Sequence, residues 1–168
     1  MYFLTLAEKK DVDTCYEIIE FAKQFQKEQG FVQWTDDYPN REIIQDDVNT
    51  KKGYIIKEDE NVLAYMCIDF AGEPSYEYID GAWGTEEPYA VVHRMAFSKN
   101  YVNRGLSSKS FELIEDFCLS QEINNIRIDT DFKNSRMQHI LEKNGFIKRG
   151  VIYFQGSERI AYDKKLKK

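Results

Sequence analysis

Strand-like and helix-like segments alternate along this chain, and the alternation restricts its fold more than any other feature. A strand-like run covers residues 2–7, and apolar residues then recur at helical spacing from Cys15 until Gly30. The same change of period repeats to the end of the chain, with no linker and no internal repeat. The order β-α-α-β-β-β-α-β-α-β-β predicts a mixed α/β fold, with residues 1–168 forming a single domain.

The remaining elements are predicted from their flanking residues. The first helix starts at Asp11 or Asp13, either of which is a suitable cap. The later strands are expected in two runs joined by a turn at 58–61, at 89–97, at 124–131, and on both sides of 155–157. The later helices are expected at 41–51, from 106 onward, and from 134 to a stop at Gly145. Residues 73–88 are expected to form an irregular, aromatic and acidic connection.

Composition indicates a soluble globular protein with a small-molecule or cationic partner. The 168 residues are 42% apolar and 31% charged, and their formal net charge is −6. Binding of nucleic acid needs a basic face, so nucleic acid is not expected as the main partner. No window approaches the roughly 20 apolar residues of a membrane span, and the N-terminal apolar stretch is too short for a signal peptide.

The three cysteines, Cys15, Cys67 and Cys118, lie far apart in the sequence. Their number is odd and their spacing matches neither a metal site nor a disulfide framework. We therefore expect no metal, and a reducing, cytoplasmic location.

The stretch YVNRGLSSKS, residues 101–110, connects a predicted strand to a predicted helix. Two interpretations are open for it. In one, successive backbone N–H groups and the helix N-terminus bind a phosphate group. In the other, Asn103 caps an ordinary helix and the single glycine, Gly105, is incidental.

Together with residues 91–115 and 134–146, this order of elements resembles the GNAT superfamily of acyl-CoA N-acyltransferases. The resemblance covers nearly the whole chain. It implies a central, twisted, mostly antiparallel sheet flanked by helices. It also implies acetyl-CoA as cosubstrate, no metal, and transfer of an acetyl or short acyl group to an amine.

The resemblance places the coenzyme on two segments. The pyrophosphate cradle would consist of Val102, Asn103, Arg104, Gly105, Leu106, Ser107 and Ser108. The pantetheine arm and the thioester would contact Met95, Ala96, Phe97 and Asn134. Val102 replaces the first polar residue of the family pattern and Ser107 its last small one. Because such a cradle acts mainly through backbone N–H groups, these departures leave its mechanism intact.

Catalysis requires a base for the amine and a proton for the departing thiolate. By strand alternation, His93 lies on the same face as Met95, and some members of the family place a base there. A histidine bonded within the sheet is the alternative. The usual acid position of the family holds Leu141, which leaves Tyr153 as a stand-in for that role. Cys118 as an acyl-carrying nucleophile is the rival mechanism, although a buried thiol is the more common use of such a residue.

The acceptor is expected to be a small-molecule or peptide amine that contacts Trp34, Tyr78 and Trp83. Aromatic rings among carboxylates suit a cation, whereas a solvated acidic loop is the alternative. The competing function is a non-catalytic acyl-CoA-binding regulatory or interaction module, and a GNAT-like fold that binds another phosphate ligand is a third. The acceptor, the acyl chain and the oligomeric state are not encoded in any recognisable motif, and a homodimer is compatible with the sequence.

Overall fold

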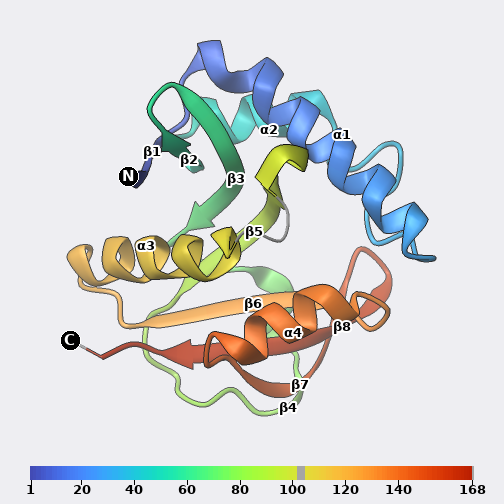
Figure 1. Cartoon of the computed structure of the whole chain (residues 1–168). Helices are drawn as coiled ribbons and strands as arrows, with labels where there is room; N and C mark the ends of the chain where they lie inside the picture. The colour runs from blue at the N-terminus through green and yellow to red at the C-terminus, as the bar shows by residue number, and fades with distance from the viewer. Residues whose placement is uncertain (102–104, 168) are drawn as a thin grey trace. The chain divides into compact units, whose positions relative to one another are not determined.

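The computed structural model describes residues 1–101 and 105–167 (Figure 1). Contacts between Cα atoms divide the chain into two compact units. Unit 1 comprises Met1–Ile68 and His93–Leu113, and unit 2 comprises Asp69–Val92 and Ile114–Lys168. Each unit is thus built from two separate stretches of sequence. The expectation that residues 1–168 form one domain stays a prediction.

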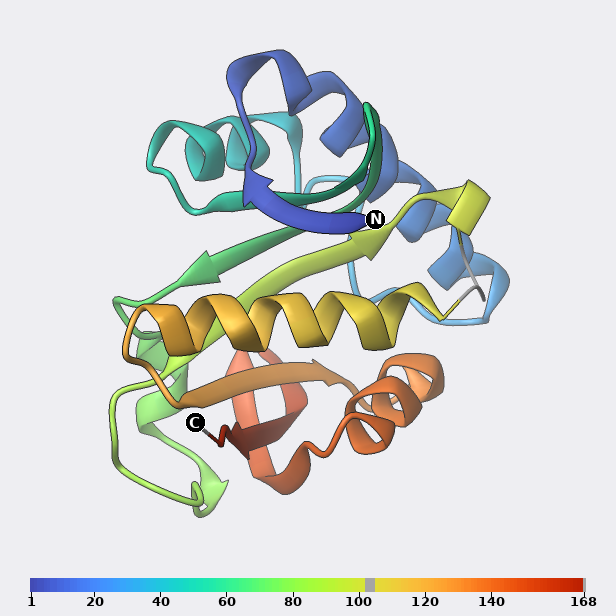
Figure 2. The ribbon, with the colours of Figure 1, turned by 60° about the vertical axis from the view of Figure 1, so that its left-hand side comes forward.

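Unit 1 consists of strands with two helices packed on them (Figures 1 and 2). Its elements are β1 (Tyr2–Leu6), a short 3-10 turn η1 (Lys9–Asp11), α1 (Val12–Glu28), α2 (Arg41–Asn49), β2 (Gly53–Glu58), β3 (Asn61–Asp69), the later part of β5 (Ala90–Phe97), η3 (Lys99–Tyr101) and the start of α3 (Leu106–Ser120). The strands follow the order β1-β2-β3-β5, and both β1 with β2 and β2 with β3 pair antiparallel.

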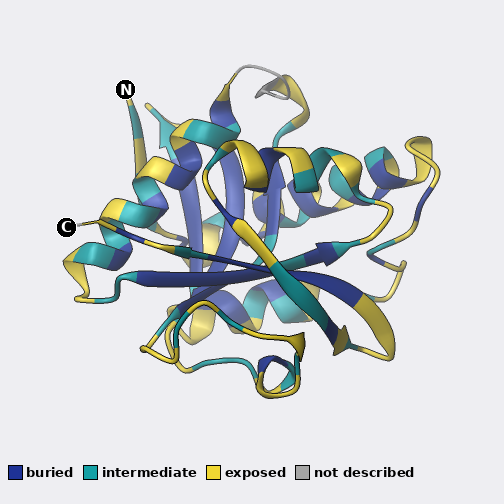
Figure 3. Ribbon diagram, turned by 90° about the horizontal axis from the view of Figure 1, so that it is seen from below, coloured by how far each residue is buried: buried dark blue, intermediate teal, exposed yellow. Residues whose placement is uncertain are grey.

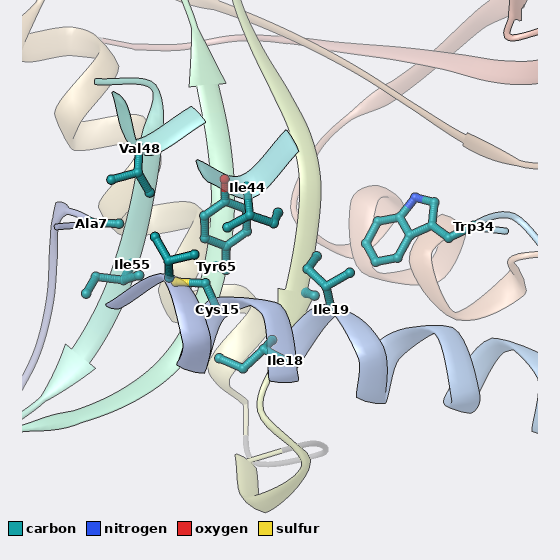
Figure 4. Close-up of a cluster of buried hydrophobic side chains, with 11 residues drawn as sticks. Ala7, Cys15, Ile18, Ile19, Trp34, Ile44, Val48, Ile55 and Tyr65 are labelled. Carbon is teal, nitrogen blue, oxygen red and sulfur yellow. The ribbon is translucent and has the colours of Figure 1, made fainter. Parts of the chain in front are cut away.

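The core of unit 1 lies between α1, α2 and the strands. Cys15, Ile18 and Ile19 are buried on one face of α1, as the helical spacing predicts. Figure 4 shows them gathered with Ile44 from α2 and Tyr65 from β3. The apolar stripe of each helix therefore determines which face it presents to the strands.

Unit 2 contains the other strands and α4. Its elements are η2 (Pro74–Glu77), β4 (Asp80–Gly81), the first part of β5, the end of α3, β6 (Asn125–Asp131), α4 (Ser135–Lys143), β7 (Ile147–Phe154) and β8 (Ser157–Lys165). The strand order is β5-β6-β8-β7-β4. Pairing is parallel between β5 and β6 and antiparallel in the other pairs of this unit. Figure 3 shows that most of β6 and β8 is buried, while the turn between β7 and β8 is exposed.

These elements confirm the predicted class, a mixed α/β fold with a mostly antiparallel sheet flanked by helices. Eight strands take part among the described residues. Asp11 is the residue that precedes α1, although its carboxylate accepts the backbone N–H of Glu8 instead of capping that helix. The helix expected over 41–51 ends at Asn49, because Lys51 adopts a left-handed φ of 60°.

The connection expected to be irregular contains two elements that the sequence did not indicate, η2 and β4. β4 pairs with β7 where Gly81 faces Gly150. A Cβ atom on Gly81 would lie 2.2 Å from the carbonyl oxygen of Arg149, and one on Gly150 would lie 2.1 Å from that of Asp80. This close approach of two backbones requires glycine at both positions. Among residues 1–101 and 105–167, no helix has the length and apolar character that crossing a membrane demands.

Candidate active site

The centre of β5 departs from extended backbone at Arg94, which has a φ of 52°. A left-handed conformation costs a residue other than glycine roughly 1–2 kcal/mol, so surrounding contacts must hold it there. We call residues 93–95 the β5 kink. His93 was expected to share a face with Met95 by the alternation of a regular strand, and that premise is wrong because Arg94 interrupts the alternation.

The side chain of Arg94 is fixed by a buried carboxylate on α2. Its Nε donates to Oδ2 of Asp47 at 2.9 Å, and its Nη2 donates to Oδ1 at 2.7 Å. Its Nη1 donates to the hydroxyl of Tyr38 at 2.9 Å. A planar guanidinium that holds a carboxylate by two parallel hydrogen bonds is fixed in orientation as well as in position.

A second donor completes the surroundings of Asp47. The hydroxyl of Tyr65 on β3 donates to Oδ2 of Asp47 at 2.6 Å. Burial, followed by the charge of Asp47, raises the pKa of Tyr65, so this hydroxyl keeps its proton and remains a donor. Burial lowers the pKa of Arg94, but the hydrogen bonds to Asp47 and the charge interactions with Cys67, Asp47 and Tyr38 together raise it overall. The Arg94 guanidinium therefore stays charged across the working pH range.

β5 is paired with β6 only at its beginning. Within the described residues, the parallel register joins Ala90 to Ile126 and Val91 to Arg127. The part of β5 that pairs with β6 therefore ends before the kink. Met95, in the kink, and Ala96 and Phe97, directly after it, were assigned to the pantetheine arm and the thioester, and all three are buried. His93 is half-buried.

Gly105 has a left-handed φ of 72° directly before α3. Its carbonyl oxygen accepts the N–H of Lys109 at 3.4 Å, so it occupies the capping position of the helix. Among the described residues, no atom beyond the chain neighbours lies within 4 Å of a Cβ atom built on Gly105. Leu106 is buried, and Ser107 and Ser108 are half-buried in the first turn, where helical N–H groups have no acceptor inside the helix. Val102, Asn103 and Arg104 lie outside the described residues.

In unit 2, the residues that were assigned to the pantetheine arm and to the acid lie at α4 and on β7. Asn134 caps α4, since its Oδ1 accepts the N–H of Met137 at 3.0 Å. Leu141, at the usual acid position of the family, is fully buried. Tyr153 lies on β7 with 60% of its surface exposed, and His139 is exposed on α4. The roles assigned to Asn134 and Tyr153 stay predictions.

Two aromatic rings lie against a buried arginine in unit 2. The guanidinium carbon of Arg127 lies 4.2 Å from the ring centre of Trp83 and 4.0 Å from that of Tyr89. The indole N–H of Trp83 donates to the carbonyl oxygen of Tyr76 at 2.9 Å. These residues line a cavity of about 360 Å³. Trp83 is therefore engaged in cation–π and hydrogen-bond contacts, and its contact with an acceptor stays a prediction.

The other two aromatic residues assigned to the acceptor lie in contrasting surroundings. Trp34 is 7% exposed and belongs to the core of unit 1 (Figure 4). Its backbone N–H donates to Oε1 of Gln26 at 3.0 Å. Tyr78 is 81% exposed. Packing thus accounts for Trp34, whereas Tyr78 is accessible to a ligand.

Cys118 is poorly suited to carry an acyl group. Its side chain is fully buried, and burial, followed by the charge of Glu115, raises the pKa of its thiol to about 12. The thiolate is the nucleophilic form, so this thiol is unreactive near neutral pH. Over the described part of the chain, no group of three or more His, Cys, Asp or Glu side chains is arranged to hold a metal ion.

The paired side chains around the β5 kink were missed by reasoning from the sequence. A charged residue inside the apolar run AVVHRMAF was the one available signal, since a buried charge requires a partner. No local spacing identifies Asp47 as that partner, because 47 residues separate the two.

Comparisons with known proteins agree with the fold. The model of the acetyltransferase (GNAT) family matches residues 15–146. An acetyltransferase of the GNAT family from Streptococcus agalactiae is 30% identical, with 99% of this chain and 96% of that chain covered and a TM-score of 0.92. No curated protein matches the sequence.

Two more distant structures share the fold. An acetyltransferase of the GNAT family from Listeria monocytogenes is 18% identical, with 98% of this chain and 95% of that chain covered and a TM-score of 0.77. The aminoglycoside acetyltransferase AAC(6')-Ib, solved in complex with coenzyme A, is 17% identical, with 98% and 95% covered and a TM-score of 0.71. Since the family model extends over most of the chain, from residue 15 to residue 146, this protein belongs to the GNAT acetyltransferase family.

Proposed function

We propose that this protein transfers an acetyl group from acetyl-CoA to an amino group by direct attack of the amine on the thioester. The observation that carries the proposal is the order of backbone features in unit 1. The β5 kink is followed by Gly105 in a left-handed conformation, and the N-terminus of α3 comes directly after it. Of the described residues beyond its chain neighbours, none has an atom within 4 Å of a Cβ atom built on Gly105. Free N–H groups at such a turn suit a pyrophosphate.

In the proposed reaction, the amine nitrogen forms a bond to the thioester carbon, and the bond between that carbon and sulfur breaks. The amine loses one proton to a base, and the departing thiolate gains one. A primary alkyl amine has a pKa of roughly 10 by analogy with lysine, so it also needs to be deprotonated before the attack. We assign the base to His93, and Tyr153 is our candidate for the proton donor.

The proposed acceptor is a cationic amine of small size. AAC(6')-Ib has been solved with ribostamycin and coenzyme A, which is a precedent for a small amine acceptor on this fold. The net charge of −6 favours a cationic acceptor here. The exposed ring of Tyr78 lies beside Glu77, also exposed, and this pair suits contact with a cation. Cys15, Cys67 and Cys118 are thiols and not half-cystines, which supports a proposed cytoplasmic location.

One observation favours a second candidate, a module that binds acyl-CoA without catalysis. The position that usually supplies the acid in this family holds Leu141, whose side chain is fully buried and has no proton to donate. In that case acetyl-CoA would bind and no acceptor would turn over.

Two measurements test the proposal together. The first is the melting temperature with and without acetyl-CoA, since ligand at 100 times its Kd adds about 2.7 kcal/mol of stability. The second is release of free thiol from acetyl-CoA across a panel of polyamines, aminoglycosides and peptide amines. Stabilisation with turnover supports the acetyltransferase, and stabilisation without turnover supports the binding module. An unchanged melting temperature would contradict both.

A further inference from the structure

We propose that Asp47 is a positioning residue for the acetyl-transfer site, acting through Arg94 on the backbone of the β5 kink. The inference rests on the proposed function and adds to it a residue on α2. Asp47 would not touch acetyl-CoA or the acceptor. Its role is to fix the direction of the peptide groups on either side of Arg94.

The left-handed backbone of the β5 kink has to be stabilised by contacts. Arg94 has a φ of 52°, a conformation that side-chain-bearing residues adopt only where their surroundings enforce it. Neither a glycine nor a proline stands at residues 93–95 to favour it. Contacts of the Arg94 side chain or of its neighbours must therefore stabilise this conformation.

The hydrogen bonds between Arg94 and Asp47 restrict the position and the orientation of the Arg94 side chain. Both carboxylate oxygens of Asp47 accept from Arg94, at 2.9 Å and 2.7 Å, and the two side chains are 14% and 8% exposed. Asp47 is itself anchored by the hydroxyl of Tyr65 at 2.6 Å. Two parallel hydrogen bonds restrict rotation as well as distance, which a lysine in place of Arg94 would not achieve.

The conformation of Arg94 also determines how the two residues beside it are placed. His93 and Met95 are the chain neighbours of Arg94, and they are the residues assigned to the base and to the start of the thioester contact. Because φ of Arg94 sets the orientation of the peptide before Met95 relative to His93, release of Arg94 would change both together. A misplacement of about 1 Å at a reacting group costs on the order of 10²-fold in rate.

The test compares Asp47→Asn with a matched control, Asp163→Asn. Asp163 is also a buried carboxylate that binds an arginine, since its Oδ1 accepts from Nε of Arg149 at 2.8 Å, and it lies on β8. Each variant removes one buried negative charge and keeps the shape of the side chain. We expect both to lower the melting temperature. Asp47→Asn alone should lower kcat, by about 10- to 100-fold, with the Kd for acetyl-CoA changed less than threefold.

A second readout is independent of turnover. The ¹³C and amide chemical shifts of Arg94 and Met95 report the backbone conformation of the kink. They should move away from their left-handed values in Asp47→Asn and stay unchanged in Asp163→Asn. If Asp47→Asn does not fold, Arg94→Lys replaces it, since it keeps the charge and loses the paired hydrogen bonds.

The results separate this inference from the proposed function. Unchanged shifts in folded Asp47→Asn, or a kcat within twofold of the wild type, would overturn the positioning role. A loss of kcat that is equal in both variants would also overturn it, because it would reflect stability alone. If the wild type binds acetyl-CoA but acetylates no acceptor, the proposed function fails instead, and the shifts alone decide whether Asp47 holds the kink.

Discussion

The buried hydroxyl of Tyr76 donates a hydrogen bond of 2.6 Å to the carboxylate of Asp129, from η2 to β6. Asp129 also lies 3.6 Å from Nη1 of Arg159. Tyr76→Phe removes the donor while the charge remains, and a hydrogen bond to a charged group contributes about 1.5–3 kcal/mol. We expect a loss of that size in the free energy of unfolding, measured by urea denaturation. Tyr78→Phe, on an exposed ring, should change it by less than about 0.5 kcal/mol.

Alkaline pH should destabilise this protein through its buried tyrosines. Burial, followed by the charge of Glu142, raises the pKa of Tyr162 to about 12, and burial followed by Asp129 raises that of Tyr76 well above its usual value. A tyrosine that is neutral in the folded state and ionised in the unfolded state favours unfolding as pH rises. Stability should therefore be complete below pH 10 and fall from about pH 10 to 12 and beyond. Denaturation curves across this range should show a shallower fall for Tyr162→Phe, and an equal fall would contradict the assignment.

Gly105→Ala should weaken acetyl-CoA binding, whereas Gly156→Ala, which should cost a similar amount of stability, should not. Gly156 is a matched control, since its φ of 76° is close to the 72° of Gly105. At both positions, no atom of the described residues beyond the chain neighbours lies within 4 Å of a built Cβ atom. Both substitutions should cost roughly 1–2 kcal/mol of stability because of the left-handed backbone. Calorimetric titration should show weaker binding of acetyl-CoA for Gly105→Ala alone. If the two variants bind acetyl-CoA with equal affinity, the turn at Gly105 does not bind the pyrophosphate.

His93→Ala should lower kcat about 10²–10⁴-fold, the usual contribution of general-base catalysis, and leave the Kd for acetyl-CoA nearly unchanged. His139→Ala, on an exposed position of α4, should have a much smaller effect. The measurement is steady-state kinetics of both variants and the wild type on one acceptor, from about pH 5.5 to about 9. A wild-type rate and pH profile in His93→Ala would assign the base to water or to another residue.

Cys118→Ala should keep the wild-type kcat, because direct attack involves no acyl-enzyme. The thiol is fully buried, and its raised pKa of about 12 leaves almost no thiolate at neutral pH. Mass spectrometry of the wild type after mixing with acetyl-CoA should detect no added acetyl group on this cysteine. A transient acetyl adduct there, lost in Cys118→Ala together with activity, would contradict direct attack.

The elements predicted correctly from sequence are those with a strong local pattern. Cys15, Ile18 and Ile19 recur at helical spacing and form the buried face of α1, and the apolar run from Ala90 to Phe97 is a strand. Local pattern fails for β4, a strand of two residues that exists because Gly81 and Gly150 allow two backbones to meet.

The candidate site was predictable where chain order determines it and unpredictable where distant partners do. The resemblance pointed to Gly105 as a turn residue, and its left-handed φ fits that reading. The assignment of His93 to the face of Met95 assumed a regular strand, and the left-handed backbone of Arg94 depends on a carboxylate 47 residues away. The pairing of Arg94 with Asp47 produces no periodic pattern in the sequence of either segment.

The two tryptophans of this chain are distributed one to each unit. Trp34 is packed in the core of unit 1, while the indole ring of Trp83 lies against the guanidinium of Arg127 in unit 2. Each is therefore an intrinsic fluorophore for its own unit, with an apolar environment in one case and a cationic neighbour in the other. Variants that keep one tryptophan at a time would show by their emission whether the two units lose their structure in a single transition or in succession.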